Sequence, residues 1–126
     1  MEIGEGSNVQ DNSRLYAGAA GEDLRIGKLV LIGHNVRIFA STIEDEAIIG
    51  MGSTVSPGTI VRRGGCVAAG SVTEPGSVIA SGEVWSGRPA RPSRALSETN
   101  RAGFAMGVRA YIGYAGEYLA TAAALR

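Results

Sequence analysis

The side chains best suited to chemistry in this chain are its single histidine, His34, and its single cysteine, Cys66. A neutral imidazole binds metal ions and can also act as a general base near neutral pH. The sequence leaves three roles open for His34: a metal ligand, a proton acceptor, or a solvent-facing residue without a role. Cys66 has no partner for an internal disulfide, which weakly favours a reducing compartment.

Apolar or β-branched residues recur at every sixth position through the middle of the chain. The series is Ile43, Ile49, Val55, Val61, Val67, Thr73, Ile79 and Trp85. Gly and Pro turn formers lie between them, and the stretch lacks both helical three-and-four spacing and the longer alternation of hairpins. A short fixed period predicts stacked units. We interpret each hexapeptide as a strand and a turn of a parallel β-helix, with one side chain inward and three units per coil.

The same period extends to the start of the chain. Ile3, Val9 and Leu15 are already in step with it. The repeat therefore opens in mid-coil, where a bare coil end would expose unpaired backbone. We expect further coils before Met1; a partner that covers this end is the alternative. Residues 16–25 interrupt the period and are predicted to protrude as a loop.

Two irregularities mark the later part of the repeat. The step from Ile38 to Ile43 is five residues, for which we expect a local β-bulge. Pro89 and Pro92 are expected to end strand pairing, because proline cannot donate a backbone hydrogen bond. The predicted β-helix domain therefore covers residues 1–90.

The tail, residues 91–126, is predicted to be a linker and a C-terminal helix. Ser97 offers a helix start. Apolar residues then follow at three-and-four spacing: Phe104, Val108, Tyr111, Ile112, Ala115, Tyr118, Leu119, Ala122 and Leu125. We expect this face to pack along the outside of the β-helix. Docking on a partner or a membrane is the alternative, although Arg109 and Glu117 argue against a membrane span.

The composition indicates one domain of 126 residues with many glycines and few aromatic residues. The 12 basic and 12 acidic residues balance, so nothing indicates a nucleic-acid surface. No signal peptide, transit peptide or membrane span is visible in the sequence.

Five phrases resemble the γ-class carbonic anhydrase family in sequence and order. They are residues 3–13 (IGEGSNVQDNS), 32–36 (IGHNV), 49–53 (IGMGS), 67–71 (VAAGS) and 87–90 (GRPA). The resemblance implies an all-β fold, a left-handed parallel β-helix of hexapeptide repeats, followed by a C-terminal α-helix. It also implies a trimer with zinc at each subunit interface, held by two His of one subunit and one His of its neighbour.

Carried over residue by residue, the resemblance leaves an incomplete ligand set. One ligand position falls on His34 and is kept, whereas the other two fall on Tyr16 and Phe39 and are lost. Phe cannot bind a metal, and Tyr binds well only as a phenolate, which is costly because the free pKa of Tyr is about 10. Gln10 matches a polar residue near the family's metal and is a candidate relic. In the family, the ligands at the positions of Tyr16 and Phe39 are the two that one subunit contributes to the same zinc, and the ligand at the position of His34 goes to the zinc at the other interface.

From the resemblance we expect a structural or assembly subunit of a heterotrimer with paralogous γ-carbonic-anhydrase subunits. Such trimers sit on the matrix side of mitochondrial respiratory complex I, next to its membrane-arm subunits. Alone the chain is expected to hold no cofactor and to be inactive. In a mixed trimer, His34 would be the third ligand of a partner's zinc.

Two enzymatic alternatives stay open. One is an active or altered zinc enzyme of the carbonic anhydrase type. The other is a hexapeptide acyltransferase that binds coenzyme A between coils and uses His34 as its general base.

Overall fold

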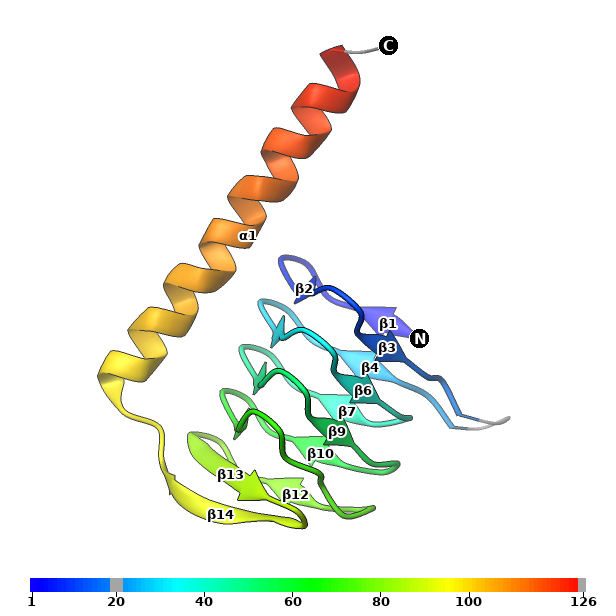
Figure 1. Cartoon of the computed structure of the whole chain (residues 1–126), viewed down its shortest axis with the longest axis vertical. Coiled ribbons are helices and arrows are strands. Elements are labelled where there is room, and N and C mark those ends of the chain that lie inside the picture. The colour runs from blue at the N-terminus through cyan, green and yellow to red at the C-terminus, as the bar shows by residue number, and fades with distance from the viewer. Residues whose placement is uncertain (19–21, 125–126) are drawn as a thin grey trace.

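The computed structural model describes residues 1–18 and 22–124, which form a solenoid of short strands with one helix beside it (Figure 1). Three sheets make the faces of the solenoid. The first contains β1 (Glu2–Ile3), β4 (Arg25–Ile26), β7 (Thr42–Ile43), β10 (Ile60–Val61) and β12 (Val78–Ile79). The second contains β2 (Asn8–Val9), β5 (Leu31–Ile32), β8 (Ile48–Ile49), β11 (Cys66–Val67), β13 (Glu83–Gly87) and β14 (Ala90–Ala95). The third contains β3 (Arg14–Leu15), β6 (Arg37–Ile38) and β9 (Thr54–Val55).

Every third residue of the inward-pointing series lies directly above the one before it, in the next coil. Ile26 pairs with Ile43 and Ile43 with Val61 in the first sheet, through parallel strands. Their side chains fill the interior with those of the other sheets, and the fully buried ones include Ile32, Ile38, Ile49, Val55, Val67 and Ile79. The predicted fold class, a left-handed parallel β-helix with a C-terminal α-helix, is confirmed.

The interior also accepts polar residues where they can pair. Thr73 occupies an inward position of the series and is buried. Its hydroxyl lies 2.9 Å from the hydroxyl of Thr59 and accepts a hydrogen bond from the Ser56 amide at 2.9 Å. These contacts satisfy a hydroxyl that would otherwise be costly to bury.

The two expected interruptions have different outcomes. Residues 19–21 of the loop predicted over 16–25 lie outside the described residues, and Arg25 already belongs to β4. The bulge expected at the five-residue step is absent, because β6 and β7 both keep register with their neighbours. Instead, the turn between β6 and β7 is one residue shorter than the six-residue period requires, and its residues Ala40 and Ser41 are buried.

The expectation that prolines end strand pairing is wrong. β14 runs antiparallel to β13 from Ala90 to Ala95 and includes Pro92, so the residues expected to start the linker form a strand. Proline is tolerated because β14 is at the edge of its sheet and Pro92 lies where the register shifts, opposite Trp85.

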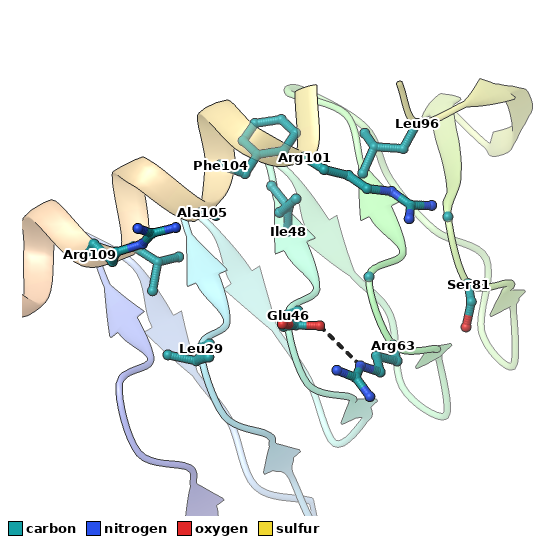
Figure 2. Close-up of a pocket in the computed structure, with 13 residues that line it drawn as sticks. Leu29, Glu46, Ile48, Arg63, Ser81, Leu96, Arg101, Phe104, Ala105 and Arg109 are labelled. Carbon is teal, nitrogen blue, oxygen red and sulfur yellow. Dashed lines mark hydrogen bonds and ion pairs between the residues drawn. The ribbon is translucent and has the colours of Figure 1, made fainter. Parts of the chain in front are cut away.

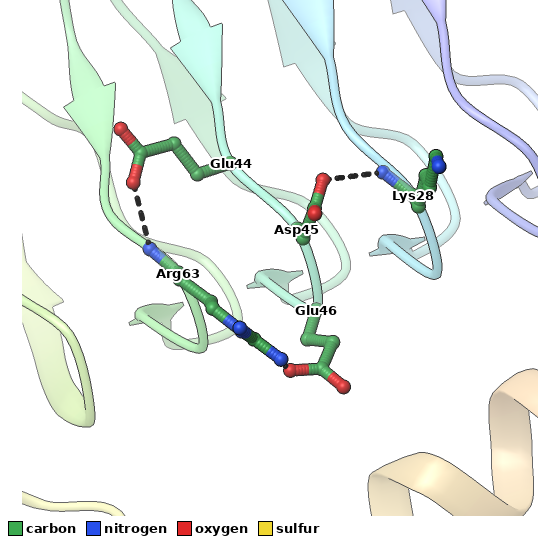
Figure 3. A network of polar contacts seen from close by, with 5 residues as sticks. All are labelled: Lys28, Glu44, Asp45, Glu46 and Arg63. Atoms are coloured by element: carbon green, nitrogen blue, oxygen red, sulfur yellow. Dashed lines mark hydrogen bonds and ion pairs between the residues drawn. The ribbon is translucent and has the colours of Figure 1, made fainter.

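Polar contacts tie together the corners that lead from the first sheet to the second (Figure 3). The Lys28 amide donates to Asp45 Oδ1 at 2.8 Å. One coil further on, the backbone amide of Arg63 donates to Glu44 Oε1 at 3.1 Å. The side-chain Nε of Arg63 donates to Glu46 Oε2 at 3.0 Å. This row of corners therefore forms a continuous, ordered edge of the solenoid.

The helix α1 runs from Glu98 to Ala124, and Ser97 caps it as predicted, since its Oγ accepts a hydrogen bond from the Asn100 amide at 3.0 Å. Its first half packs on the outer side of the second sheet. There Phe104 joins a cluster of the buried residues Ile48, Cys66, Val84 and Leu96, with Leu31 and Ala68 beside them.

The second half of α1 departs from the prediction that the whole apolar face packs on the β-helix. Figure 1 shows the helix running past the first coil, and the side chains of Tyr118 and Leu119 are 76% and 67% exposed. The helix still contacts the first coil at Ile112, since a Cβ placed on Gly6 would lie 3.3 Å from Ile112 Cδ1. None of the described residues form a helix with the combined length and hydropathy of a transmembrane segment.

Candidate functional site on the third sheet

The residues singled out from the sequence flank the third sheet of the β-helix. His34 follows β5, in the turn that leads from the second sheet into β6 of the third. Tyr16 and Phe39 come directly after β3 and β6, at the opposite ends of these strands. Because strands of one sheet are stacked in register, Tyr16 and Phe39 are placed in the same column.

Tyr16 and Phe39 form one aromatic pair. Their rings are stacked, with centroids 4.8 Å apart and planes 10° from parallel. Each backbone amide is held in the coil ladder, Tyr16 by the Ile38 carbonyl at 2.8 Å and Phe39 by the Val55 carbonyl at 3.0 Å. The two positions that the resemblance identifies as lost ligands of one site are therefore adjacent, although Tyr16 is still 38% exposed.

His34 lies at the other end of this face, away from the aromatic pair. Its carbonyl accepts the Gly52 amide at 2.8 Å, and the neighbouring Asn35 amide donates to the Asp11 carbonyl at 3.0 Å. Asn35 has a φ of 55°, which makes the sharp turn that leaves His34 at the corner. The imidazole is half-buried and, within the described part of the chain, makes no hydrogen bond.

Gln10 lies one coil away from His34, directly after β2. Its Nε2 donates to Asn8 Oδ1 at 3.1 Å, and its backbone amide donates to the Ile32 carbonyl at 3.0 Å. The Asn8 Nδ2 is buried with no partner among the described residues. The predicted relic is therefore engaged in a local polar contact beside the His34 corner.

Sequence reasoning missed the basic character of this face. Arg14 and Arg37 are register partners on β3 and β6, and both are exposed. With Asn12, Ser13 and Asn35 they line a cavity of about 360 Å³. Neither arginine has an ion-pair partner in the described ranges. The sequence could have revealed that the two arginines are neighbours, because they are 23 residues apart, the same separation as the stacked pair Leu15 and Ile38.

The donor set of a single chain does not fit zinc. A catalytic zinc site needs three protein ligands that supply nitrogen, sulfur or oxygen. The lost positions present a phenol stacked on a phenyl ring, and His34 lies at the opposite end of the face. Over residues 1–18 and 22–124, no three His, Cys, Asp or Glu residues are grouped to hold a metal ion.

Comparison with known proteins places these features in a family, although no family model matches the chain. Gamma carbonic anhydrase 3, mitochondrial, of Arabidopsis thaliana is 53% identical over 109 residues, which cover 82% of this chain and 42% of the relative. Protein YrdA of Escherichia coli K12 is 37% identical over 125 residues, covering 94% of this chain and 68% of the relative.

A solved structure supports the same relationship. The crystal structure of a hexapeptide transferase family protein from Anaplasma phagocytophilum has a TM-score of 0.86 and 37% identity, covering 92% of this chain and 68% of that chain. The chain spans 38% to 43% of the length of the mitochondrial Arabidopsis relatives. By its motifs, its repeat fold and these relatives, the chain belongs to the γ-class carbonic anhydrase family.

Proposed function

We propose that this chain is a structural subunit of a heterotrimer with ligand-complete γ-carbonic-anhydrase paralogues, and that it is catalytically inactive alone. The observation that carries the proposal is the Tyr16–Phe39 stack, with ring centroids 4.8 Å apart. It occupies the two positions at which the resemblance places a subunit's own pair of zinc ligands. An aromatic pair of this kind adds about 0.5–1.5 kcal/mol to packing, and it offers no metal donor comparable to two imidazoles.

His34 has a different role in this proposal. It is the position that the family presents to the neighbouring subunit's site. Its imidazole is half-buried at a corner and is not engaged by a hydrogen bond within the described chain, so it remains available to a neighbour. A partner that supplies two His would then gain its third from this chain.

The basic face agrees with contact to another subunit. Arg14 and Arg37 are adjacent, exposed and without carboxylate partners in the described ranges. Like charges on neighbouring strands are unfavourable unless an opposite charge is brought to them. A paralogue with a carboxylate opposite these residues would relieve that repulsion and favour a mixed trimer over a homotrimer.

The cellular setting is part of the proposal. Three relatives carry the name mitochondrial gamma carbonic anhydrase. We therefore infer a mitochondrial location, with the trimer on the matrix side of complex I against its membrane-arm subunits. The test is native purification by a tag on this chain: paralogous subunits and complex I subunits should be recovered together. Recovery of a homotrimer free of both would contradict the proposal.

Zinc content of the mixed trimer tests the role of His34. His34→Ala should remove one zinc per trimer and leave assembly intact. Met51→Ala is the matched control, because Met51 is an exposed residue at the same corner one coil further on. Unchanged zinc in the His34 variant would leave the chain structural but without a ligand role.

A second candidate function is acyl transfer. It is favoured by the name of the Anaplasma protein, which is 37% identical to this chain and is called a hexapeptide transferase family protein. In this case His34 would act as a general base at a subunit interface, and an acyl-coenzyme A would bind between coils. Saturable acyl-coenzyme A binding that is lost in a His34→Ala variant would favour this function over the structural one.

A further inference from the structure

A groove of about 520 Å³ lies between the first half of α1 and one row of coil corners (Figure 2). The corner residues Leu29, Glu46, Arg63 and Ser81 connect the first sheet to the second. His34, in contrast, connects the second sheet to the third. The groove is therefore separate from the face described above, and its volume is within the usual range of small-molecule sites.

The floor and the helix wall of this groove are apolar. Ile48, Leu96 and Val108 line it and are 6%, 8% and 6% exposed, and Phe104 closes it from the helix. Leu29 lines it at one end and is 40% exposed, more than an aliphatic side chain in a packed core. Because Ile48, Leu96 and Val108 are already almost covered, an occupant with an apolar chain would remove from water mainly the surface of Leu29 and Phe104, which is favourable.

The charges around the groove are unequal. Its only lining carboxylate among the described residues is that of Glu46, which is already paired with Arg63 at 3.0 Å. Arg101 and Arg109 also line the groove, and neither has a carboxylate within ion-pair distance in the described part of the chain. The groove therefore carries an excess of positive charge over an apolar floor.

The two unpaired arginines lie at different ends of the groove. They are eight residues apart on α1, which is about 12 Å along the helix axis. Arg101 is in the first turn of the helix, where the backbone also favours negative charge. Its guanidinium reaches across to the Gly82 corner, since a Cβ placed on Gly82 would lie 2.6 Å from Arg101 Nη2. The Arg101 end is therefore the better place for an anionic head.

We propose that this groove binds a free fatty carboxylate, with its carboxylate on the Arg101 guanidinium and its acyl chain over Ile48, Phe104 and Val108. A guanidinium donates two parallel hydrogen bonds to a carboxylate, which fixes the head of the ligand. The chain then runs along the helix toward Arg109. This site goes beyond the proposed function, because it uses none of the residues of the His34 face.

The test is titration of the whole protein with decanoate below its micelle concentration, by calorimetry. Saturable binding of one decanoate per chain is expected, with decanol at least tenfold weaker and acetate not bound. Arg101→Gln should weaken decanoate binding at least tenfold. Arg109→Gln is the matched control, with the same loss of charge on the same helix, and should change it less than threefold.

A steric variant tests the location independently of charge. Ala105 lines the groove, so Ala105→Trp should abolish binding, whereas Ala102→Trp, an exposed position of α1 outside the groove, should not. A photoreactive fatty acid should label the segment around Phe104 in the unaltered protein, which needs no variant to fold. The proposal would be overturned by equal affinity for decanoate and decanol, or by unchanged decanoate affinity in the Arg101→Gln variant. Labelling of another segment would also overturn it, as would binding to anionic lipid vesicles without binding of decanoate.

Discussion

At the residue scale, the third sheet brings together the two positions that the resemblance identifies as lost ligands. Tyr16 and Phe39 keep the backbone hydrogen bonds of their coil positions, and their rings stack at 4.8 Å. The register of β3 and β6 is what places the two residues in one column. If the resemblance places the ligands correctly, two imidazoles at these positions would lie side by side.

This arrangement leads to a prediction about restored ligands. Tyr16→His combined with Phe39→His should let a homotrimer take up zinc, because two imidazoles would replace the stack and His34 of a neighbour would be the third ligand. Zinc per trimer is measured by elemental analysis, and weak hydration of carbon dioxide is a second readout. The single variants serve as controls and should bind far less. A folded double variant without zinc would show that Tyr16 and Phe39 are not at ligand positions.

Cys66 gives a second prediction at this scale. It is buried beneath α1 in the cluster with Phe104, and burial raises the pKa of its thiol from 9.0 to about 11. Between these values the unfolded chain loses the proton first, so the free energy of unfolding should fall as the pH rises from about 9 to about 11, by at most about 1.4 kcal/mol per pH unit. A Cys66→Ala variant should lack this component. Identical pH slopes for the two proteins in denaturant titrations would contradict it.

At the element scale, the stability of the β-helix comes from inward columns rather than from the corners. Ile49 and Val67 are register partners and are fully buried, whereas Arg62 at the corner is 49% exposed and pairs with Glu44 at 2.8 Å. Surface ion pairs of this kind contribute about 0–1 kcal/mol. Interior aliphatic residues contribute more, because their removal leaves a cavity in a narrow core.

The corresponding prediction compares the two classes of position. Ile49→Ala or Val67→Ala should lower the free energy of unfolding by about 1–4 kcal/mol. Arg62→Ala should lower it by less than about 0.5 kcal/mol. Denaturant unfolding of each variant gives the measurement, and losses of equal size at core and corner would be inconsistent with this register.

At the scale of the whole molecule, the β-helix presents two separate surfaces. The third sheet carries His34, the aromatic pair and the two adjacent arginines, and it is the face proposed to meet other subunits. The second sheet is covered by the first half of α1, which also forms the wall of the apolar groove. A variant on one surface should therefore leave the other unchanged.

Metal analysis of the isolated protein is the prediction at this scale. Expressed without partners, the chain should contain far less than one zinc per subunit interface, because each interface of a homotrimer would have one imidazole in place of three. Coexpression with a ligand-complete paralogue should raise the zinc content. One zinc per interface in a well-folded homotrimer would contradict the proposal that Tyr16 and Phe39 replace two ligands.

The sequence by itself determined which residues point into the β-helix, because each hexapeptide places one side chain in its narrow interior. This depends on local spacing and not on the conformation of the loops. Ile43, Val61 and Ile79 could be assigned to one column from their spacing, and the structure pairs them in that way. The resemblance likewise identified His34, Tyr16 and Phe39 from short phrases. These features depend on local spacing or on the order of motifs.

Only the tertiary structure decided which side chains meet across coils and across elements. Tyr16 stacks on Phe39, and Arg14 lies beside Arg37, only because β3 and β6 pair in the register that the structure shows. The interruption of the repeat after Leu15 hides this register in the sequence. The antiparallel strand containing Pro92 forms because it lies at an edge, where no amide is needed. The angle of α1 leaves Tyr118 exposed and opens a groove beside Arg101, since a helix packs only where the side chains of a second surface support it.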